Sequence, residues 1–273
     1  MIWLRLVSKQ SIKVFRFYSL TTMSAFAKRI EEVSLNSWPA LQSIIYDGWI
    51  LRFSRGYSKR ANSVNPIYPS SKDLTRKVTQ CERIYSQKGL PPVFRMTPFA
   101  SPSNLDQYLG RRKYKIIDRT IVLYLDLRMT NNRLDTAFKI NPEKLDPWLE
   151  IFHRFVGSPV GGQAIHREIL QVIPSKRILA TLRYSDETVA CGLGVLEGGY
   201  MGLFDLITSP EMRRMGYGTG LVSGLLEWAR ENGALHAYLQ VEKRNAPAIN
   251  LYTRLGFQEI YQYWYRVPED FVG

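Results

Sequence analysis

The chain has 273 residues, of which 45% are hydrophobic and 22% are charged, and its formal net charge is +13. This length allows one large domain or two small ones with a sizeable core, and the composition is typical of a globular protein rather than a disordered one. No apolar run is long enough to span a membrane. The basic residues form no Lys/Arg block, which argues against a nucleic-acid partner, whereas the positive charge suits a small anionic ligand.

Cysteine and histidine usage gives no sign of a disulfide framework or a metal site. Cys81 and Cys191 lie far apart in the chain, and Cys191 falls within an apolar run. His153, His166 and His236 lack metal-ligand spacing, so we expect no bound metal and assign all three histidines structural or surface positions. Two buried thiols favour a reducing compartment, and we therefore predict a cytoplasmic location.

The first 22 residues are basic and contain no acidic residue, and they resemble an organellar transit peptide only loosely. A regular helical pattern begins just after Met23. We predict that residues 1–22 form a peripheral extension and that the folded part of the chain starts near Met23.

The first half of the chain is expected to alternate strands and helices. A polar turn, SRGYSKR, separates its first two strands, and Gly89 ends its longest internal helix. In chain order we predict a helix over 25–38, strands over 45–53 and 61–65, a helix over 72–87, a short strand in VFRMT, a short helix over 105–109 and a long strand over 114–127.

The second half is expected to contain an antiparallel meander of three strands, because turn signals separate three strand-like runs. In chain order we predict a connection over 128–140, helices over 142–155 and 162–172, strands over 178–184, 188–196 and 200–208, a glycine-containing segment, a helix ending near 231, a strand over 235–242, a helix over 246–255 and a last strand over 257–267.

The two halves share the order strands, helix, short strand, short helix and long strand. Tyr114 in the first half stands where Phe257 stands in the second. We infer an internal duplication, with a degenerate first half over 23–127 and a second half over 128–273. The expected fold class is α/β (α+β), with a mixed, mostly antiparallel sheet flanked by helices.

The segment RRMGYGTG, residues 213–220, resembles glycine patterns that bind phosphate. It lacks the Lys of a P-loop. Gly216 and Gly218 partly match a Rossmann fingerprint, but the third glycine is missing and a polar stretch separates the segment from the preceding strand. A dinucleotide-binding protein therefore remains an alternative, with Glu242 as its ribose-binding acid. The pattern Arg-x-x-Gly-x-Gly at the start of a helix is complete, because Arg213 precedes the two glycines at the required spacing.

A helix start of this kind can hold an anion. Its first turn leaves about four backbone N–H groups unpaired, and their dipoles favour a negative charge. Gly216 and Gly218 let a pyrophosphate approach the backbone, and Arg213 and Arg214 add positive charge. Gly220 lies outside the pattern, and we expect it to serve helix packing. A loop whose glycines serve only close packing is the other interpretation.

Two longer segments strengthen the phosphate interpretation. SPEMRRMGYGTGLVSGLLEWA is followed by YLQVEKRNAPAINLYTRLGF, and together they resemble the signature of the GNAT (GCN5-related) N-acetyltransferase family. The order of strands and helices extends the resemblance to about residues 119–267. More weakly, IYDGWILRFSRGYSKRANSVNP resembles the N-terminal part of bacterial two-part members. The resemblance implies a GNAT fold, acetyl-CoA as cosubstrate and an amine as acceptor.

The resemblance also implies the roles of individual residues. The pyrophosphate would lie on the first turn of the helix, the pantetheine arm beside the end of the preceding strand, and Asn245 against the cofactor arm, while Tyr252 would protonate the leaving thiolate. The implied cofactor-binding residues are Leu206, Ile207, Thr208, Arg213, Arg214, Met215, Gly216, Tyr217, Gly218, Thr219, Asn245 and Tyr252. Asn245 is also placed to cap the helix that follows it.

The general base is open at this stage. Some family members carry Glu twelve residues before the tyrosine, where this chain has Gln240, which cannot act as a base. Asp205 and Glu242 are the candidates, directly or through water, and a water chain without a single base is the alternative. An ammonium with a pKa near 10.4 must lose a proton before it can attack.

Only one strand follows the last helix, whereas family members often have two. We therefore expect the strand over 120–127, or a strand from a partner chain, to complete the sheet. The oligomeric state expected is a monomer or a homodimer. A non-catalytic acyl-CoA-binding sensor is the second function that we consider, because Gln240 replaces the usual acid. Candidate residues for the acceptor pocket are Trp49, Arg52, Arg60, Asn62, Tyr261 and Tyr263.

Overall fold

A computed structural model describes residues 20–129, 138–157 and 160–272. Most of the predicted N-terminal extension lies outside these residues, and the first helix begins at Leu20, a few residues before the predicted start. The elements of the first half are α1 (Leu20–Ser37), β1 (Gln42–Tyr46), β2 (Trp49–Phe53), β3 (Val64–Asn65), α2 (Leu74–Gln87), β4 (Phe94–Met96), α3 (Leu105–Arg111) and β5 (Lys115–Asp126).

The second half begins at a short strand and ends at a long one. Its elements are β6 (Ile140–Pro142), α4 (Leu145–Val156), α5 (Val160–Gln171), β7 (Lys176–Tyr184), β8 (Glu187–Glu197), β9 (Tyr200–Thr208), α6 (Tyr217–Glu231), β10 (His236–Glu242), α7 (Ala246–Arg254) and β11 (Gln258–Val267). The predicted meander corresponds to β7, β8 and β9, which pair in antiparallel order.

One sheet runs through both halves of the chain, in the order β1-β2-β3-β4-β11-β5-β10-β9-β8-β7-β6. Among the described strands, only the pairs β3–β4 and β10–β9 are parallel. The expected mixed, mostly antiparallel sheet is thus confirmed. The parallel doubly wound sheet of a Rossmann protein is not what this chain forms.

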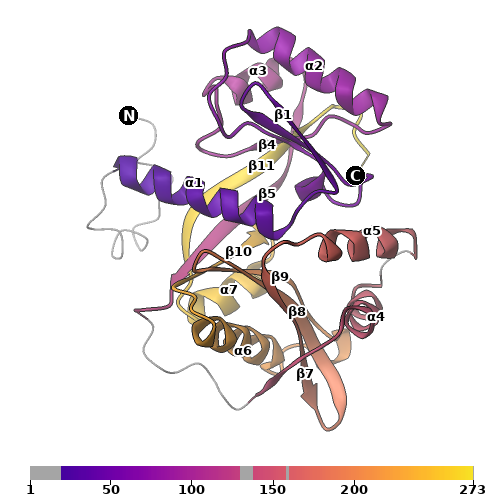
Figure 1. Ribbon diagram of the computed structural model, residues 1–273, viewed down its shortest axis with the longest axis vertical. Coiled ribbons are helices and arrows are strands. Elements are labelled where there is room, and N and C mark those ends of the chain that lie inside the picture. Colours follow the sequence, from indigo (N-terminus) through magenta and orange to yellow (C-terminus); the bar gives the residue numbers. More distant parts are fainter. Residues whose placement is uncertain (1–19, 130–137, 158–159, 273) are drawn as a thin grey trace.

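The two halves exchange their last strands at the centre of this sheet. β5 pairs with β10 on one side and with β11 on the other, and β11 in turn pairs with β4 (Figure 1). The prediction that a first-half strand over 120–127 completes the sheet is therefore confirmed. Outward from the β11–β5 pair, each side continues with an antiparallel pair of strands, then a parallel pair and then an antiparallel one. The boundary at residue 127 stays a prediction, because one continuous sheet crosses it.

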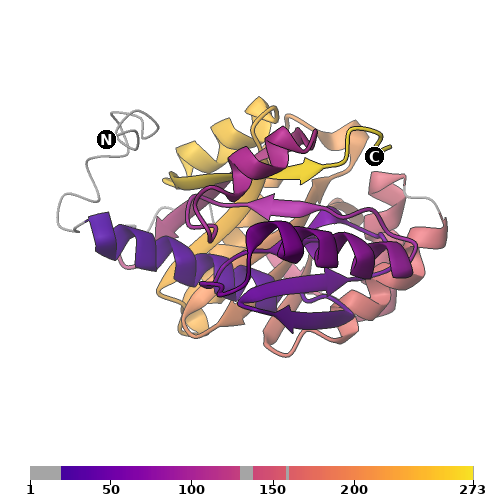
Figure 2. The same ribbon diagram turned by 90° about the horizontal axis from the view of Figure 1, so that it is seen from above.

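Helices cover both faces of the central strands. On one face, α1, α4 and α5 pack on a cluster that includes Val122, Tyr238 and Phe204, and on the other, α6 and α7 pack on Leu123 and Leu239. The alternation of side chains along β5 and β10 produces both clusters. Figures 1 and 2 show α1 crossing the middle of the sheet, where it joins the two halves.

A buried ion pair fixes α1 to the sheet. Glu31 on α1 accepts bonds from Arg95 of β4 at 2.5 and 3.0 Å, and the Tyr261 hydroxyl donates to it at 2.5 Å. Arg95 also donates to Tyr265 at 3.2 Å. Both charged side chains are essentially inaccessible to water. The paired geometry satisfies them there, and it sets the position of α1 over β4 and β11.

Both cysteines are buried and unpaired, as the sequence predicts. Burial raises the pKa of the Cys81 thiol to about 12, which keeps this thiol protonated and unreactive at neutral pH.

Candidate active site

The site begins where two neighbouring strands diverge. β9 and β10 pair in parallel only from Tyr200 and His236 to Leu203 and Leu239. Beyond Leu203, β9 remains bonded to β8 on its other side, and β10 remains bonded to β5. The edge of β9 that faces β10 is thus open over residues 204–208, which include residues 206–208, predicted to pair with a cofactor arm.

A β-bulge directs Asp205 away from the regular alternation of β9. The register against β8 shifts between Phe204 and Ile207, and Asp205 itself has a φ of +49°. Bulges of this kind re-aim a side chain next to a functional site. Here the bulge turns the Asp205 carboxylate toward a cavity.

The glycine-containing segment forms an exposed loop that leads into α6. Arg214 and Gly216 both have left-handed backbones, with φ of +64° and +88°, and Gly216 is the N-cap residue without a side-chain cap. The backbone N–H groups at the first turn of α6 consequently lack a side-chain acceptor. A Cβ on Gly218 would come within 3.4 Å of the Thr208 hydroxyl, so the glycine lets α6 start close to the end of β9. This arrangement fits a pyrophosphate.

Gly220 serves packing, as expected. A Cβ at this position would lie 2.6 Å from the ring of Phe138. Gly220 is buried, whereas the segment from Arg213 to Gly216 is exposed.

Asn245 and Tyr252 lie at and within α7. The Asn245 side chain accepts a bond from the Ala248 amide at 3.2 Å, which confirms the predicted helix cap. Tyr252 of α7 is 9% exposed and packs in the core cluster that α6 and α7 form with the sheet. Its hydroxyl has no hydrogen-bond partner among the described residues. Burial raises the pKa of Tyr252 to about 12, so the phenol stays protonated at neutral pH. Tyr252 is not part of the cavity lining that contains Asp205 and Glu242.

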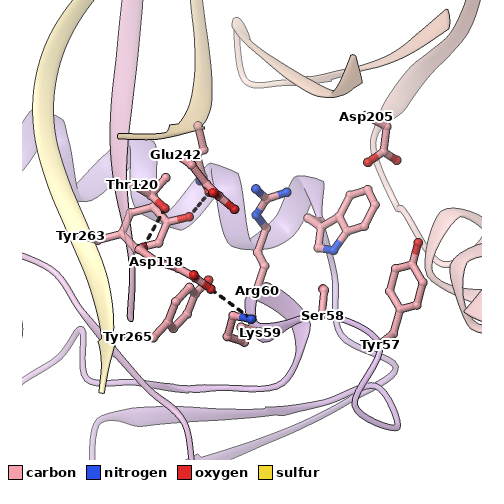
Figure 3. A pocket seen from close by; sticks show the side chains of 12 residues that line it. Tyr57, Ser58, Lys59, Arg60, Asp118, Thr120, Asp205, Glu242, Tyr263 and Tyr265 are labelled. Atoms are coloured by element: carbon pink, nitrogen blue, oxygen red, sulfur yellow. Dashed lines mark hydrogen bonds and ion pairs between the residues drawn. The ribbon is translucent and has the colours of Figure 1, made fainter. Parts of the chain in front are cut away.

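A cavity of about 450 Å³ opens on the α1 side of the sheet, between the two halves (Figure 3). This volume is typical of small-molecule sites. Its lining includes the ends of the two diverging strands, β9 and β10, and the turn over residues 57–60 of the first half. The lining residues are Trp38, Tyr57, Ser58, Lys59, Arg60, Asp118, Thr120, Asp205, Gln240, Glu242, Tyr263 and Tyr265.

Asp205 is held by a pair of buried histidines. Its Oδ2 lies 3.0 Å from Nε2 of His166, and Nδ1 of His166 lies 3.3 Å from Nε2 of His153. An ionised carboxylate only accepts, so His166 must donate from Nε2. Tyr57 stacks on the His166 ring, with centroids 5.5 Å apart. These contacts restrict the Asp205 carboxylate to one orientation.

The histidine pair also makes folding sensitive to pH. Burial, reinforced by His166, lowers the pKa of His153 from 6.5, and burial likewise lowers the pKa of His236. As pH falls below about 6.5, the unfolded chain binds protons that the folded chain does not, so stability is complete above this pH and decreases below it. We expect a lower unfolding temperature at about pH 5.5 than at about pH 7.5, and a smaller difference in His153→Gln. An equal difference in both proteins would contradict this account.

Gln240 occupies a second hydrogen-bond chain. Its Oε1 accepts from the Tyr263 hydroxyl at 2.9 Å, and its amide contacts the Ser34 hydroxyl on α1. Burial raises the pKa of Tyr263, but the charges of Arg95 and Arg60, together with hydrogen bonds to the phenol oxygen, outweigh burial, and the net shift is downward. A more acidic phenol is a stronger donor, so Tyr263 holds Gln240 firmly in place.

The two predicted bases differ in their surroundings. Glu242 binds Arg244 at 2.5 Å on the surface and is half exposed. Asp205 is 16% exposed and is bound by His166 inside the cavity. The geometry therefore favours Asp205 as the group that meets an acceptor.

Four of the candidates for the acceptor pocket do not line this cavity and have packing roles instead. Trp49 is a core residue that donates to the Ser101 carbonyl, Arg52 is buried and bonded to backbone carbonyls, Asn62 caps a turn, and Tyr261 binds Glu31. These side chains are polar because they satisfy buried backbone and an ion pair. Arg60 and Tyr263 do line the cavity.

Sequence reasoning missed His166, Trp38 and Tyr57. His166 has no motif around it, and only the fold brings α5 against the bulge of β9. Among the described residues, no group of His, Cys, Asp and Glu could hold a metal ion, and no helix has the length and apolar character to cross a membrane.

Comparison with known sequences identifies relatives over nearly the whole chain. A family model described as "Probable histone acetyltransferase Rv0428c C-terminal" matches residues 25–266. The "Uncharacterized N-acetyltransferase YobR" of Bacillus subtilis is 30% identical over 246 residues, covering 88% of this chain and 98% of that protein. The "Probable histone acetyltransferase Rv0428c" of Mycobacterium tuberculosis is 23% identical over 219 residues, covering 80% and 67%.

Solved structures share the fold. A GCN5-related N-acetyltransferase from Kribbella flavida aligns with a TM-score of 0.68 at 14% identity, covering 89% of this chain and 95% of that one. Another from Sphaerobacter thermophilus aligns with a TM-score of 0.57 at 14% identity, covering 86% and 84%. The predicted GNAT fold is confirmed by these likenesses.

Proposed function

Because the chain belongs to the GNAT N-acetyltransferase family, we propose that it transfers the acetyl group of acetyl-CoA to a primary amine of a small molecule or peptide. The divergence of β9 from β10 beside a cavity lined by Asp205, Gln240 and Glu242 carries this proposal. An amine in the cavity and a thioester between the strands would meet there. Acetyl-CoA supplies the activated carbonyl carbon.

The chain supplies the contacts that hold the cosubstrate. The open backbone of residues 206–208 would pair with the pantetheine arm, and the amides of residues 214–219 with Arg213 would hold the pyrophosphate. Asn245 would contact the cofactor arm while it caps α7. The exposed loop, its left-handed Gly216 and the uncapped start of α6 support this assignment.

Asp205 is the proposed proton acceptor. As the amine nitrogen bonds to the carbonyl carbon, its proton passes to the Asp205 carboxylate directly or through one water, while the bond from that carbon to sulfur breaks. His166 is a positioning residue, because it touches Asp205 and not the acceptor. The buried histidine pair keeps the carboxylate aimed at the cavity.

Tyr252 is the proposed donor to the leaving sulfur. It stays protonated, and it lies on the opposite face of the sheet from the cavity, so it would approach the thioester from the α7 side. We expect Tyr252→Phe to lower kcat by about 10²-fold, at the low end for acid catalysis because a thiol with a pKa near 8.5 is already a fair leaving group. Steady-state release of free thiol measures this effect. An unchanged rate would remove Tyr252 from the mechanism.

A non-catalytic acyl-CoA-binding sensor is the second candidate, since Gln240 stands where some relatives carry Glu. Calorimetric binding of CoA without thiol release across a panel of amines would favour it. We further propose a cytoplasmic enzyme, a monomer or homodimer, built from halves over 23–127 and 128–273. The buried, unpaired cysteines support the reducing location.

A further inference from the structure

Most charges that line the cavity are already paired. Lys59 lies 3.0 Å from Asp118, and Glu242 binds Arg244. Asp205 accepts its bond from His166, whose other nitrogen accepts from His153. The hydrogen bond from His166 leaves the other oxygen of Asp205 directed at the cavity without a cation among the described residues paired to it.

Arg60 is different from these residues. Its guanidinium makes no hydrogen bond or ion pair with any described residue, and its Nε is buried without a partner. A buried donor without an acceptor is costly, at about 1–3 kcal/mol and more for a charged group. A guanidinium of this kind in a cavity suits an anionic ligand.

The Arg60 side chain is also held in one place. The buried Arg52 donates to the Arg60 carbonyl at 2.9 Å, and the guanidinium lies 5.7 Å from the ring centroids of both Trp38 and Phe204. Cation–π contacts of this kind restrict the side chain without satisfying its N–H groups. Figure 3 shows the Arg60 guanidinium directed into the cavity, on the side where Glu242 lies. Arg60 and Asp205 both line this cavity, so the cation and the carboxylate face the same space.

We propose that Arg60 binds the carboxylate of the acceptor, so that the acceptor is a free amino acid whose amine meets Asp205. This inference rests on the proposed function and names the substrate class of the same site. One fixed positive and one fixed negative charge complement a molecule that carries both. The planar guanidinium matches a carboxylate in bidentate geometry. Asp118 and Glu242 also line the cavity, and they would repel a dianionic phosphate more strongly than a carboxylate.

Matched amines test this proposal. Each amino acid is compared with the amine that lacks its carboxylate: β-alanine with ethylamine, 4-aminobutyrate with propylamine, and lysine with cadaverine. In the wild-type protein we expect kcat/KM to be roughly 10- to 100-fold higher for the preferred amino acid than for its partner, from the value of a charge-assisted hydrogen bond. Arg60→Gln should remove this ratio, mainly by raising KM for the amino acid. Arg60→Lys should keep part of it.

Lys59→Gln is the matched control, because Lys59 is a neighbouring cation that is already paired with Asp118. It should keep the ratio between the two amines. Peptides with a free N-terminus and an amidated C-terminus carry an amine but no terminal carboxylate. They distinguish a free amino acid from a peptide as the acceptor. Faster transfer to such peptides than to any amino acid would overturn the proposal, as would equal losses on both members of a pair in Arg60→Gln.

A binding measurement separates this proposal from the proposed function. Calorimetric titration of the amino acid, with CoA present in place of acetyl-CoA, requires no turnover. Amino-acid binding that Arg60→Gln abolishes, without any acetylated product in the transfer assay, would support the Arg60 site and reject the acetyltransferase. Acetyl transfer with no preference for acceptors that carry a carboxylate would support the acetyltransferase and reject the Arg60 site. Absence of both binding and preference would overturn the Arg60 site.

Discussion

Asp205→Asn is expected to lower kcat/KM for the acceptor by about 10²–10⁴-fold, the range typical of a lost general base. Asparagine keeps the size of the side chain and can still bond to His166, so the bulge and the cavity should persist. What is lost is the ability to take the proton of the attacking amine. The measurement is steady-state thiol release over about pH 6–9, with CoA affinity measured beside it to establish that the cosubstrate still binds.

Glu242→Gln is the matched control for this variant. Glu242 lines the same cavity but is half exposed and paired with Arg244, so most of the activity should remain. His166→Gln should lower kcat less than Asp205→Asn and alter the shape of the pH–rate profile, which a merely structural loss would not do. If Glu242→Gln were the more damaging change, the base would lie on β10 and the assignment of Asp205 would be wrong.

Glu31→Leu is expected to lower the free energy of unfolding by about 3–5 kcal/mol, because it leaves the Arg95 charge buried without a counterion. The same change removes the acceptor of the Tyr261 hydroxyl. It also releases α1, which carries Ser34 and is followed directly by Trp38 of the cavity lining, so activity should fall with stability. Urea unfolding followed by tryptophan fluorescence measures the change.

Two further variants test whether the unpaired Arg95 charge causes this loss of stability. The double variant Glu31→Leu with Arg95→Met should recover much of the loss, since removing both charges leaves no unpaired ion. Glu168→Gln breaks the exposed pair with Arg55 and should change stability by less than about 1 kcal/mol. A loss of similar size in Glu168→Gln, or no recovery in the double variant, would contradict the account.

Local patterns were sufficient to predict most of the second half of the fold, although β6 lies where a connection and the start of a helix were expected. The Arg-x-x-Gly-x-Gly segment, the alternation along β10 and the Asn cap of α7 each depend on residues close in the chain, and each element forms where it was expected. Even the long-range place of β5 could be predicted, because the count of strands after α7 was one short. A missing strand must be replaced, since an open edge in a sheet leaves backbone groups unpaired.

The interior of the site could not be predicted in this way. His166 reaches Asp205 across 39 residues, and Tyr261 reaches Glu31 across 230. No periodicity or spacing encodes such contacts, because they depend on how α1 and α5 pack on the sheet. For the same reason Arg52 and Arg60 look alike in the sequence, although one satisfies buried carbonyls and the other faces the cavity.

Mass spectrometry of a single reaction tests the central claim most directly. The wild-type protein is incubated with acetyl-CoA and an equimolar mixture of primary amines and amino acids, beside Asp205→Asn. We predict an N-acetylated product that forms together with an equal amount of free CoA, and at least 10²-fold less of both in the variant. Binding of CoA without either product in the wild-type protein would contradict the account and leave a coenzyme-binding protein in place of an enzyme.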